Sequence, residues 1–335
     1  MTRKIVIVLI ASAMLLSLPS ALAGCACSAG GTWDPYAFLN YNPTLSISST
    51  ADGRSAGVQD DYRAEDFPNG DILRPMPSVS SSDTVLAITE KENSSDGAYV
   101  KGALMLSRGS LVNQNNTLKS PEEIASALGR AGVTPSDRIV VYGDDPGDAA
   151  LGFIALKYVG QRDVSLLDGG IERWKSMGLP VQSTPSVRDE SDYIPNKQDL
   201  VATYDYVISG EAQIVDVRPF RDFGLSRIPG AIHIDSERIT DGDRIVDNET
   251  LSGLFAPLQR DRPVVVYSEN LNQSSLVWFA LQLMGYNATI YSWSDWVSHT
   301  TSLTQNAPGA LGRSSTAVTG SEGTGSVSRY RKLGR

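Results

Sequence analysis

The sequence VVVYSENLNQSSLVWFALQLMG, residues 264–285, decides the fold of this chain. It begins with an apolar run of strand length, continues with a six-residue loop that is polar except for Leu271, and predicts a helix beginning at Ser274 or Ser275. A short loop before a helix N-terminus directs several backbone N–H groups to one place, which favours binding of a small anion. The loop residues expected to form this site are Ser268, Glu269, Asn270, Leu271, Asn272 and Gln273.

The same pattern occurs earlier, in IVVYGDDPGDAALGFIALKYVG at residues 139–160. The two stretches align without a gap at an offset of 125 residues, which places Tyr142 against Tyr267 and Gly143 against Ser268. A gap-free match across strand, loop and helix indicates a duplicated domain. We expect two domains, each with its own core.

Strand and helix signals alternate in both halves. Strands are expected at residues 83–89 and 98–106, and two more within residues 212–234. Ser120 followed by Pro121, with Glu123 three residues after the serine, predicts a capped helix, and residues 247–255 predict another. Such alternation predicts an α/β fold whose mostly parallel sheets are covered by helices on both faces, with ligands at the carboxyl ends of the strands.

The N-terminal residues predict export and membrane anchoring. Arg3 and Lys4 precede the apolar run of residues 5–18, as in a secretory signal peptide, and this run is short for a membrane span. The sequence Leu-Ala-Gly-Cys at residues 22–25 resembles the lipobox of prokaryotic lipoproteins. We expect lipidation of Cys25 to hold the protein in the lipid bilayer, on the extracytoplasmic face of the envelope. An ordinary secreted protein with an incidental cysteine is the alternative.

Composition suggests the domain organisation. Residues 1–24 form the signal peptide, and residues 25–82, rich in Gly, Ser, Asp, Asn and Pro, are expected to be a tether and irregular lead-in. The first domain is predicted at residues 83–181, a polar linker at 182–196 and the second domain at 197–300. Residues 301–335 are predicted to be a disordered tail whose basic end, SRYRKLGR, could contact anionic lipid or a partner.

Charge and residue counts exclude several functions. The chain of 335 residues has a net charge of −9, which argues against nucleic acid as a partner. The only cysteines are Cys25 and Cys27, so the predicted domains contain no thiol, disulfide or thiolate metal site. Two histidines, His233 and His299, are too few for a histidine-based metal site. We therefore expect neither a metal nor a cofactor.

Several motifs together resemble the rhodanese family. In the second half these are IVDVRPFRDF at residues 214–223, RIPGAIHI at 227–234, the stretch from residue 264 onward and YSWSDW at 291–296. In the first half, IVVYGDD and ALKYVGQRDVSLLDGGIERWKSMGLPV resemble the two-domain thiosulfate and mercaptopyruvate sulfurtransferases. The resemblance covers residues 83–299 and implies a tandem of two rhodanese-like domains. The first domain is degenerate, because it lacks the Asp-Val-Arg strand.

The chain departs from the family pattern at the decisive positions. The resemblance implies a cysteine at the first loop position, which carries a persulfide, and a basic residue five positions later. Ser268 and Gln273 occupy these positions in the second half, and Gly143 and Asp148 occupy them in the first. Arg227 replaces the histidine of the usual GHIPGA motif. Sulfur transfer by the family mechanism therefore lacks its nucleophile.

The residue Ser268 is interpreted as a loop-capping hydroxyl, not as a nucleophile. A hydroxyl needs a neighbouring base, and the loop offers only Glu269, whose ordinary pKa makes it a weak one. Asp216 and Arg218 keep the family pattern and are interpreted as supporting residues, an Asp–backbone turn followed by an exposed arginine. Arg227 is a third supporting candidate.

These observations favour a membrane-anchored, extracytoplasmic pseudoenzyme. The retained scaffold is expected to bind a small anion or a protein partner at the loop of the second domain. One alternative is a working thiosulfate or mercaptopyruvate sulfurtransferase with a non-standard nucleophile. Another is a phosphatase-like hydrolase that uses the same loop, although the related phosphatases also attack through cysteine.

Overall fold

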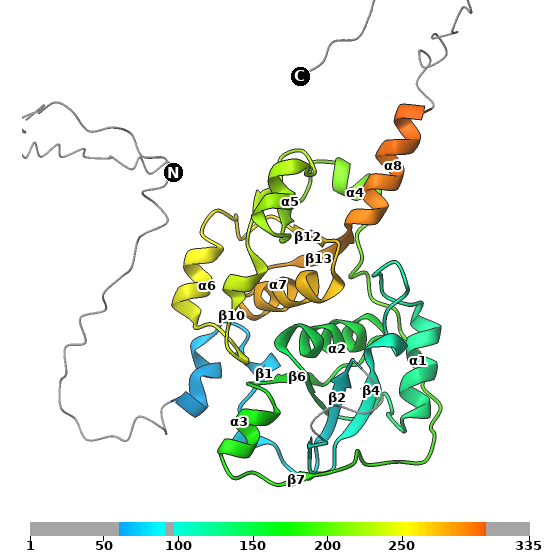
Figure 1. The fold of residues 1–335 in the computed structure, drawn as a ribbon, viewed down its shortest axis with the longest axis vertical. Coiled ribbons are helices and arrows are strands. Elements are labelled where there is room, and N and C mark those ends of the chain that lie inside the picture. Colours follow the sequence, from blue (N-terminus) through cyan, green and yellow to red (C-terminus); the bar gives the residue numbers. More distant parts are fainter. Residues whose placement is uncertain (1–59, 91–96, 306–335) are drawn as a thin grey trace, which may run out of the picture. The chain divides into compact units, whose positions relative to one another are not determined.

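The computed structural model describes residues 60–90 and 97–305. The expected signal peptide, the lipidation site at Cys25 and the tail after residue 305 lie outside the described residues. The described part contains two parallel sheets with helices around them (Figure 1). No helix within it has the length and apolar character needed to cross a membrane.

The first sheet has five strands, and each pair of adjacent strands in it is parallel. Helices α1 and α2 pack on one face, and α3 packs on the other through Trp174. The strand order is β1 (Leu73–Arg74), β6 (Val164–Leu167), β5 (Ile139–Gly143), β2 (Thr84–Thr89) and β4 (Leu104–Ser107), and the helices are α1 (Pro121–Arg130), α2 (Pro146–Tyr158) and α3 (Ile171–Ser176).

The second sheet has four parallel strands. Helices α6 and α7 cover one face, and α4 and α8 cover the other, so the expected fold class is confirmed. The strand order is β13 (Ala288–Ser292), β12 (Val264–Ser268), β8 (Gln213–Asp216) and β9 (Ile232–His233), and the helices are α4 (Tyr204–Ile208), α5 (Phe220–Leu225), α6 (Asn248–Leu254), α7 (Leu271–Leu283) and α8 (Trp293–Gln305). Helix α8 extends past residue 300, where the folded region was expected to end.

The duplication is visible in the element bounds. Strand β12 and helix α7 each begin and end 125 residues after β5 and α2. The equivalent tyrosines of the two halves make the same type of contact. Tyr142 Oη accepts a hydrogen bond from Val100 N at 3.2 Å, and Tyr267 Oη accepts one from Ile228 N at 3.1 Å.

Helix α7 begins at Leu271, three or four residues earlier than predicted. The side chain of Asn270 accepts a hydrogen bond from Asn272 N at 3.0 Å and caps the helix, so only Glu269 and Asn270 separate β12 from α7. An asparagine cap satisfies an N–H group that the first turn leaves free, which allows polar residues to open the helix. Three of the six predicted loop residues therefore belong to the first turn of α7.

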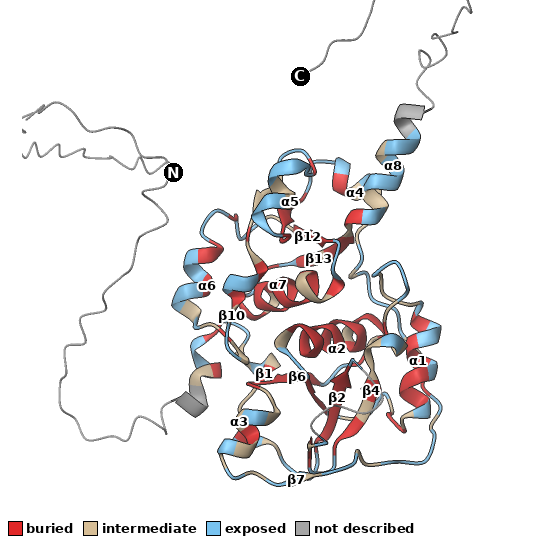
Figure 2. Ribbon diagram, viewed as in Figure 1, coloured by how far each residue is buried: buried red, intermediate tan, exposed pale blue. Residues whose placement is uncertain are grey.

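Each half has a buried cluster of its own on one face of its sheet, but the expectation of two fully separate cores is wrong. One cluster of buried residues runs through both halves, because α2 and α7 pack against each other (Figure 2). The ring of Phe153 lies 5.0 Å from that of Phe279 and 6.0 Å from that of Trp278. Helices that are apolar around their whole circumference bury one side on their own sheet and the other on a neighbour.

The described part of the lead-in is folded onto the domains. Strand β1 extends the first sheet by pairing with β6, and Phe67 is buried in the core. Asn69 N donates to Leu283 O at 3.0 Å, which ties this segment to the end of α7. Residues 60–82 therefore do not form the irregular tether that their composition predicted.

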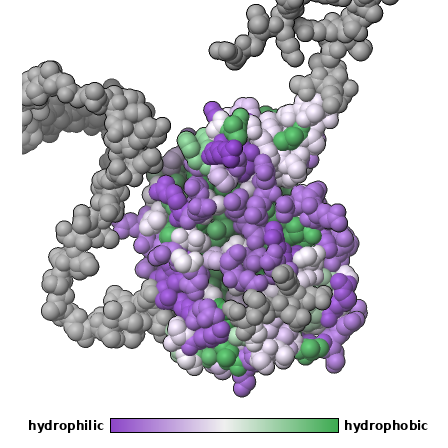
Figure 3. Space-filling model, viewed as in Figure 1, coloured by the Kyte–Doolittle hydropathy of each residue, from purple (hydrophilic) through white to green (hydrophobic). Residues whose placement is uncertain are grey.

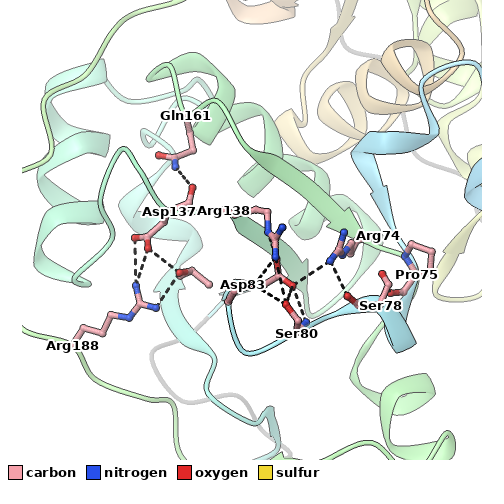
Figure 4. A network of polar contacts seen from close by, with 11 residues as sticks. Arg74, Pro75, Ser78, Ser80, Asp83, Asp137, Arg138, Gln161 and Arg188 are labelled. Carbon is pink, nitrogen blue, oxygen red and sulfur yellow. Dashed lines mark hydrogen bonds and ion pairs between the residues drawn. The ribbon is translucent and has the colours of Figure 1, made fainter.

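The linker is also fixed to the first half (Figure 4). Arg188 forms an ion pair with Asp137 at 3.2 Å, and Gln161 Nε2 donates to Asp137 O at 2.6 Å. Tyr193 Oη donates to Gln161 Oε1 at 2.6 Å.

Figure 4 also shows Asp83 in contact with Arg138, near the amino ends of β2 and β5 and thus opposite the edge where ligands are expected. Short antiparallel pairs, β3 (Tyr99–Val100) with β7 (Val181–Gln182) and β10 (Thr240–Asp241) with β11 (Arg244–Ile245), complete the fold.

Candidate functional site

The junction of β12 and α7 places Ser268 at the carboxyl edge of the second sheet. Its side chain is only 5% exposed, and its hydroxyl donates to Gln273 Oε1 at 2.8 Å and accepts from Asn270 N at 3.1 Å. An amide oxygen does not remove a proton at neutral pH, so this arrangement does not activate the hydroxyl. Glu269 contacts Arg218 at 3.4 Å instead. The hydroxyl of Ser268 caps the loop.

The N–H groups of the loop are partly used by the loop's own side chains. Asn270 N donates to Ser268, and Asn272 N donates to Asn270 Oδ1. The side chain of Leu271 is 5% exposed and belongs to the core. The expected anion cradle therefore has fewer free donors than the sequence pattern suggested.

The interpretation of Arg218 as exposed is wrong. The whole residue is 2% exposed. Its Nη2 lies 2.7 Å from Asp216 Oδ2, and the guanidinium lies 3.8 Å from the centre of the Trp293 ring. The expected turn is present, since Arg218 N donates to Asp216 Oδ1 at 3.0 Å. A guanidinium can be buried where a carboxylate pairs with it and an aromatic face covers it.

The buried pair extends into a network beneath the loop. Tyr267 Oη donates to Asp216 Oδ2 at 2.5 Å, and Arg218 Nη2 donates to Ser226 O at 2.6 Å. Burial lowers the pKa of Arg218, but hydrogen bonds and charge from Asp216 outweigh it and hold the pKa above its ordinary value. Burial is the main cause that raises the pKa of Tyr267, and the hydrogen bond to Asp216 raises it further. Asp216 is thus occupied by structural partners.

The structure does not bring Arg227 into this group. Its side chain is exposed, and its guanidinium lies 4.8 Å from the ring centre of Phe223. The two histidines also have local roles: His233 Nε2 lies 2.8 Å from Arg218 O, and His299 stacks on Tyr204 at 4.4 Å. Across residues 60–90 and 97–305, no three His, Cys, Asp or Glu side chains are placed to hold a metal ion.

The equivalent junction in the first half is closed. A Cβ atom added to Gly143 would lie 2.5 Å from Ala149 N and 2.7 Å from Asp148 Cβ. Asp145 caps α2 by accepting a hydrogen bond from Asp148 N at 2.9 Å. No side chain fits at Gly143 unless the backbone of α2 moves.

The two junctions meet at a pair that the sequence analysis missed. Asn272 Nδ2 donates to Asp148 Oδ1 at 2.7 Å, and Asp148 is 5% exposed. Burial, together with the nearby charge of Asp145, raises the pKa of Asp148 to about 6. The 125-residue alignment offered a signal, because it places Asp148 and Asn272 in equivalent first turns of α2 and α7.

A cleft of about 550 Å³ opens between these first turns. Asn270, Asn272 and Gln273 line it on the side of the second half. Among the described residues that line it, the charged ones are mostly acidic, with Arg108 as the single base beside Glu90, Asp144, Asp145, Asp148 and Glu237. Five carboxylates against one guanidinium disfavour a small anion in this cleft.

The β10–β11 hairpin of the second half covers the carboxyl edge of the first. Asp243 Oδ2 accepts a hydrogen bond from Gly170 N at 2.8 Å, and Arg244 contacts Asp168 at 2.5 Å. Asp168 also pairs with Arg63. Burial raises the pKa of the Asp168 carboxyl, but hydrogen bonds from both arginines outweigh it and keep the pKa below its ordinary value. These contacts give Gly170 N and the Asp168 carboxylate partners within the protein, so we interpret them as structural.

Comparison with known proteins identifies relatives along most of the described part. A family model described as the rhodanese-like domain matches residues 82–177 and 201–299. The sulfur carrier protein TtuD of Thermus thermophilus is 30% identical over 210 residues, which are 53% of this chain and 74% of that protein. A Haloferax volcanii protein named as a thiosulfate sulfurtransferase is 28% identical over 231 residues, which are 60% of this chain and 81% of the relative.

The solved structures show the same fold. The 3-mercaptopyruvate sulfotransferase SseA of Escherichia coli matches with a TM-score of 0.58 at 20% identity, over 64% of this chain and 92% of that chain. YnjE matches with a TM-score of 0.58 at 20% identity, over 65% of this chain and 61% of that chain.

Proposed function

Because the chain belongs to the rhodanese-like domain family, we propose that it is an exported, lipid-anchored member that binds a protein partner and does not transfer sulfur. The observation that carries this proposal is the pair of residues at the two strand–helix junctions. Ser268 stands at one junction and Gly143 at the other, and the only cysteines of the chain are Cys25 and Cys27.

The chemistry of sulfur transfer supports the proposal. A thiolate can hold a sulfane sulfur as a persulfide, and a serine oxygen has no corresponding intermediate. The hydroxyl of Ser268 donates to an amide, and the nearest carboxylate, Glu269, pairs with Arg218. Gly143 leaves no room for a nucleophilic side chain at the strand–helix junction of the first half.

The alternative is a sulfurtransferase with a non-standard nucleophile, which the name of the Haloferax volcanii relative favours. A thiosulfate:cyanide assay on the purified chain separates the two functions. We expect no thiocyanate above the protein-free reaction. Robust turnover by the unmodified chain would replace our proposal with the alternative.

A gain-of-function variant tests whether only the nucleophile is missing. Ser268→Cys combined with Gln273→Arg should produce measurable transfer, because Asn270 N already donates to the side-chain atom at position 268 and the arginine adds positive charge, and both lower the pKa of a thiol. Gly143→Cys is the matched control and should remain inactive, because its side chain would collide with α2. If the double variant is folded but inactive, the pocket itself has lost the shape that transfer requires.

The acidic cleft favours a protein partner with basic side chains over a small anion. Calorimetric titration with thiosulfate or phosphate should therefore show no saturable binding. Asp144→Lys together with Glu237→Lys should create such binding, because both residues line the cleft. Saturable anion binding by the unmodified chain would contradict this part of the proposal.

Anchoring is tested separately at Cys25. We expect mass spectrometry of the mature N-terminus to find a lipid-modified Cys25, and Cys25→Ser to move the protein from the membrane fraction to the soluble fraction. If Cys25→Ser remains in the membrane fraction, another element is the anchor.

A further inference from the structure

A lobe at the carboxyl edge of the second sheet exposes large apolar side chains. Residues 219–230, here called the α5 lobe, connect β8 to β9, and Ile228 is its one buried residue. Phe220 is 71% exposed and Leu225 is 73% exposed, and a Cβ atom added at Gly224 would meet open space. Figure 2 shows α5 as largely exposed, and Figure 3 shows hydrophobic patches in the part of this face where Figure 1 places α5.

The lobe is held in place from below. Arg218 donates to Ser226 O, which fixes the end of α5 to the buried pair with Asp216. The rings of Phe220 and Phe223 lie 5.5 Å and 4.9 Å from that of His233. Exposed apolar side chains on a rigid support are typical of an interaction surface, because little conformational entropy is lost when they are covered.

The charge of the lobe differs from that of the chain. Arg221 and Arg227 are exposed beside the apolar side chains, and Asp222 is the single acid between them and is half-buried. The whole chain has a net charge of −9. Phenylalanine and leucine next to arginine are the combination that an anionic lipid surface accepts, with the apolar groups in the headgroup region and the cations at the phosphates.

The size of the surface also favours lipid over a folded protein. Two such side chains expose on the order of 200–300 Å². A stable protein interface needs roughly 800 Å² from each partner. Insertion into a bilayer interface, in contrast, needs only a few apolar side chains with cationic neighbours.

We propose that the α5 lobe inserts Phe220 and Leu225 into the interface of an anionic bilayer. This contact would hold the carboxyl edge of the second sheet close to the membrane. The contact does not require lipidation of Cys25, and two inserted side chains bind more weakly than a lipid anchor, so Cys25→Ser is still expected to leave the membrane fraction. Failure of either idea leaves the other standing.

The test uses the chain purified from residue 26 onward, which has no lipid, with vesicles of equal parts phosphatidylglycerol and phosphatidylcholine. Co-sedimentation should give a measurable partition coefficient. Phe220→Ser with Leu225→Ser should lower it about tenfold or more, since two apolar side chains no longer leave water. Both residues are exposed, and circular dichroism should show an unchanged fold.

Two controls separate the lobe from other causes. Ile194→Ser removes an equally exposed apolar side chain in the linker, 81% exposed, and should leave the partition coefficient unchanged. Arg221→Gln with Arg227→Gln should lower binding to anionic vesicles. Equal binding by the Phe220 and Leu225 double variant would show that another part of the chain, such as the basic segment 328–335, makes the contact, and would overturn the proposal. Absence of vesicle binding, or equal binding to neutral vesicles, would also overturn it.

Discussion

The two strand–helix junctions share one backbone design and differ in what surrounds it. In the first half, Tyr142 is in register with Ala87 of β2, and in the second half Tyr267 is in register with Asp216 of β8. Both tyrosines accept a backbone N–H group, but only Tyr267 also donates to a carboxylate. The duplicated scaffold thus keeps this backbone contact, while only the second copy places a buried carboxylate, Asp216, beside the tyrosine.

The second difference is the space at the end of the strand. Gly143 is packed against α2 and the first half is covered by the β10–β11 hairpin, whereas Ser268 holds a side chain with hydrogen-bond partners. The first junction is closed mainly by backbone atoms of α2. The second junction differs from the family pattern in its side chains, Ser268 and Gln273. Substitutions should therefore affect the two junctions very differently.

The largest effect is expected at the buried charge pair. Arg218→Met should destabilise the protein by about 3–5 kcal/mol, because it leaves Asp216 buried without its cation. Arg227→Met removes an exposed arginine from the neighbouring α5 lobe and should cost less than about 0.5 kcal/mol. Urea unfolding monitored by fluorescence measures both. A loss below about 1 kcal/mol for Arg218→Met would show that water reaches Asp216.

The next largest effects on stability are expected for substitutions at Gly143 and Ser268. Gly143→Ala should cost about 2–3 kcal/mol, because its Cβ would lie 2.5 Å from Ala149 N. Ser268→Ala should cost about 1 kcal/mol, the value of its hydrogen bonds. Equal losses in thermal unfolding would contradict the contrast between a closed and an open junction.

The contact between the junctions should depend on pH. The pKa of Asp148 is about 6 in the folded protein, above its ordinary value, so this group stabilises the fold fully below about pH 4 and the contribution is lost as pH rises through 6. Asp148→Asn keeps an acceptor for Asn272 and removes this loss. It should be more stable than the unmodified chain by about 1–2 kcal/mol at pH 7.5 and equally stable near pH 4. A pH-independent difference between the two proteins would contradict the shift.

The smallest effect is expected at Glu269. It is 62% exposed and lies 3.4 Å from Arg218, so Glu269→Gln should change stability by about 0.3 kcal/mol and less at high salt. A loss above about 1 kcal/mol in urea unfolding would show that Glu269 belongs to the buried network.

Much of the fold was predictable because the information is local. The apolar runs of β5 and β12, the long apolar segments of α2 and α7, and the capping box at Ser120 each lie within one stretch of sequence. The start of α7 was misplaced because a polar first turn reads as a loop until the side chain of Asn270 is seen to cap it. The lead-in was misjudged because β1 has two residues and becomes a strand only by pairing with β6.

The sequence by itself determined the duplication, the parallel α/β fold, the position of the strand–helix junctions and the lack of a thiol in either half. Those features depend on residue type and short spacing. The tertiary structure decided that Arg218 is buried, that Asp148 meets Asn272, that the two halves share a core and that a hairpin covers the first junction. Each of these depends on which distant segments pack together, and packing fixes burial and charge environment in a way that neighbouring residues along the chain do not.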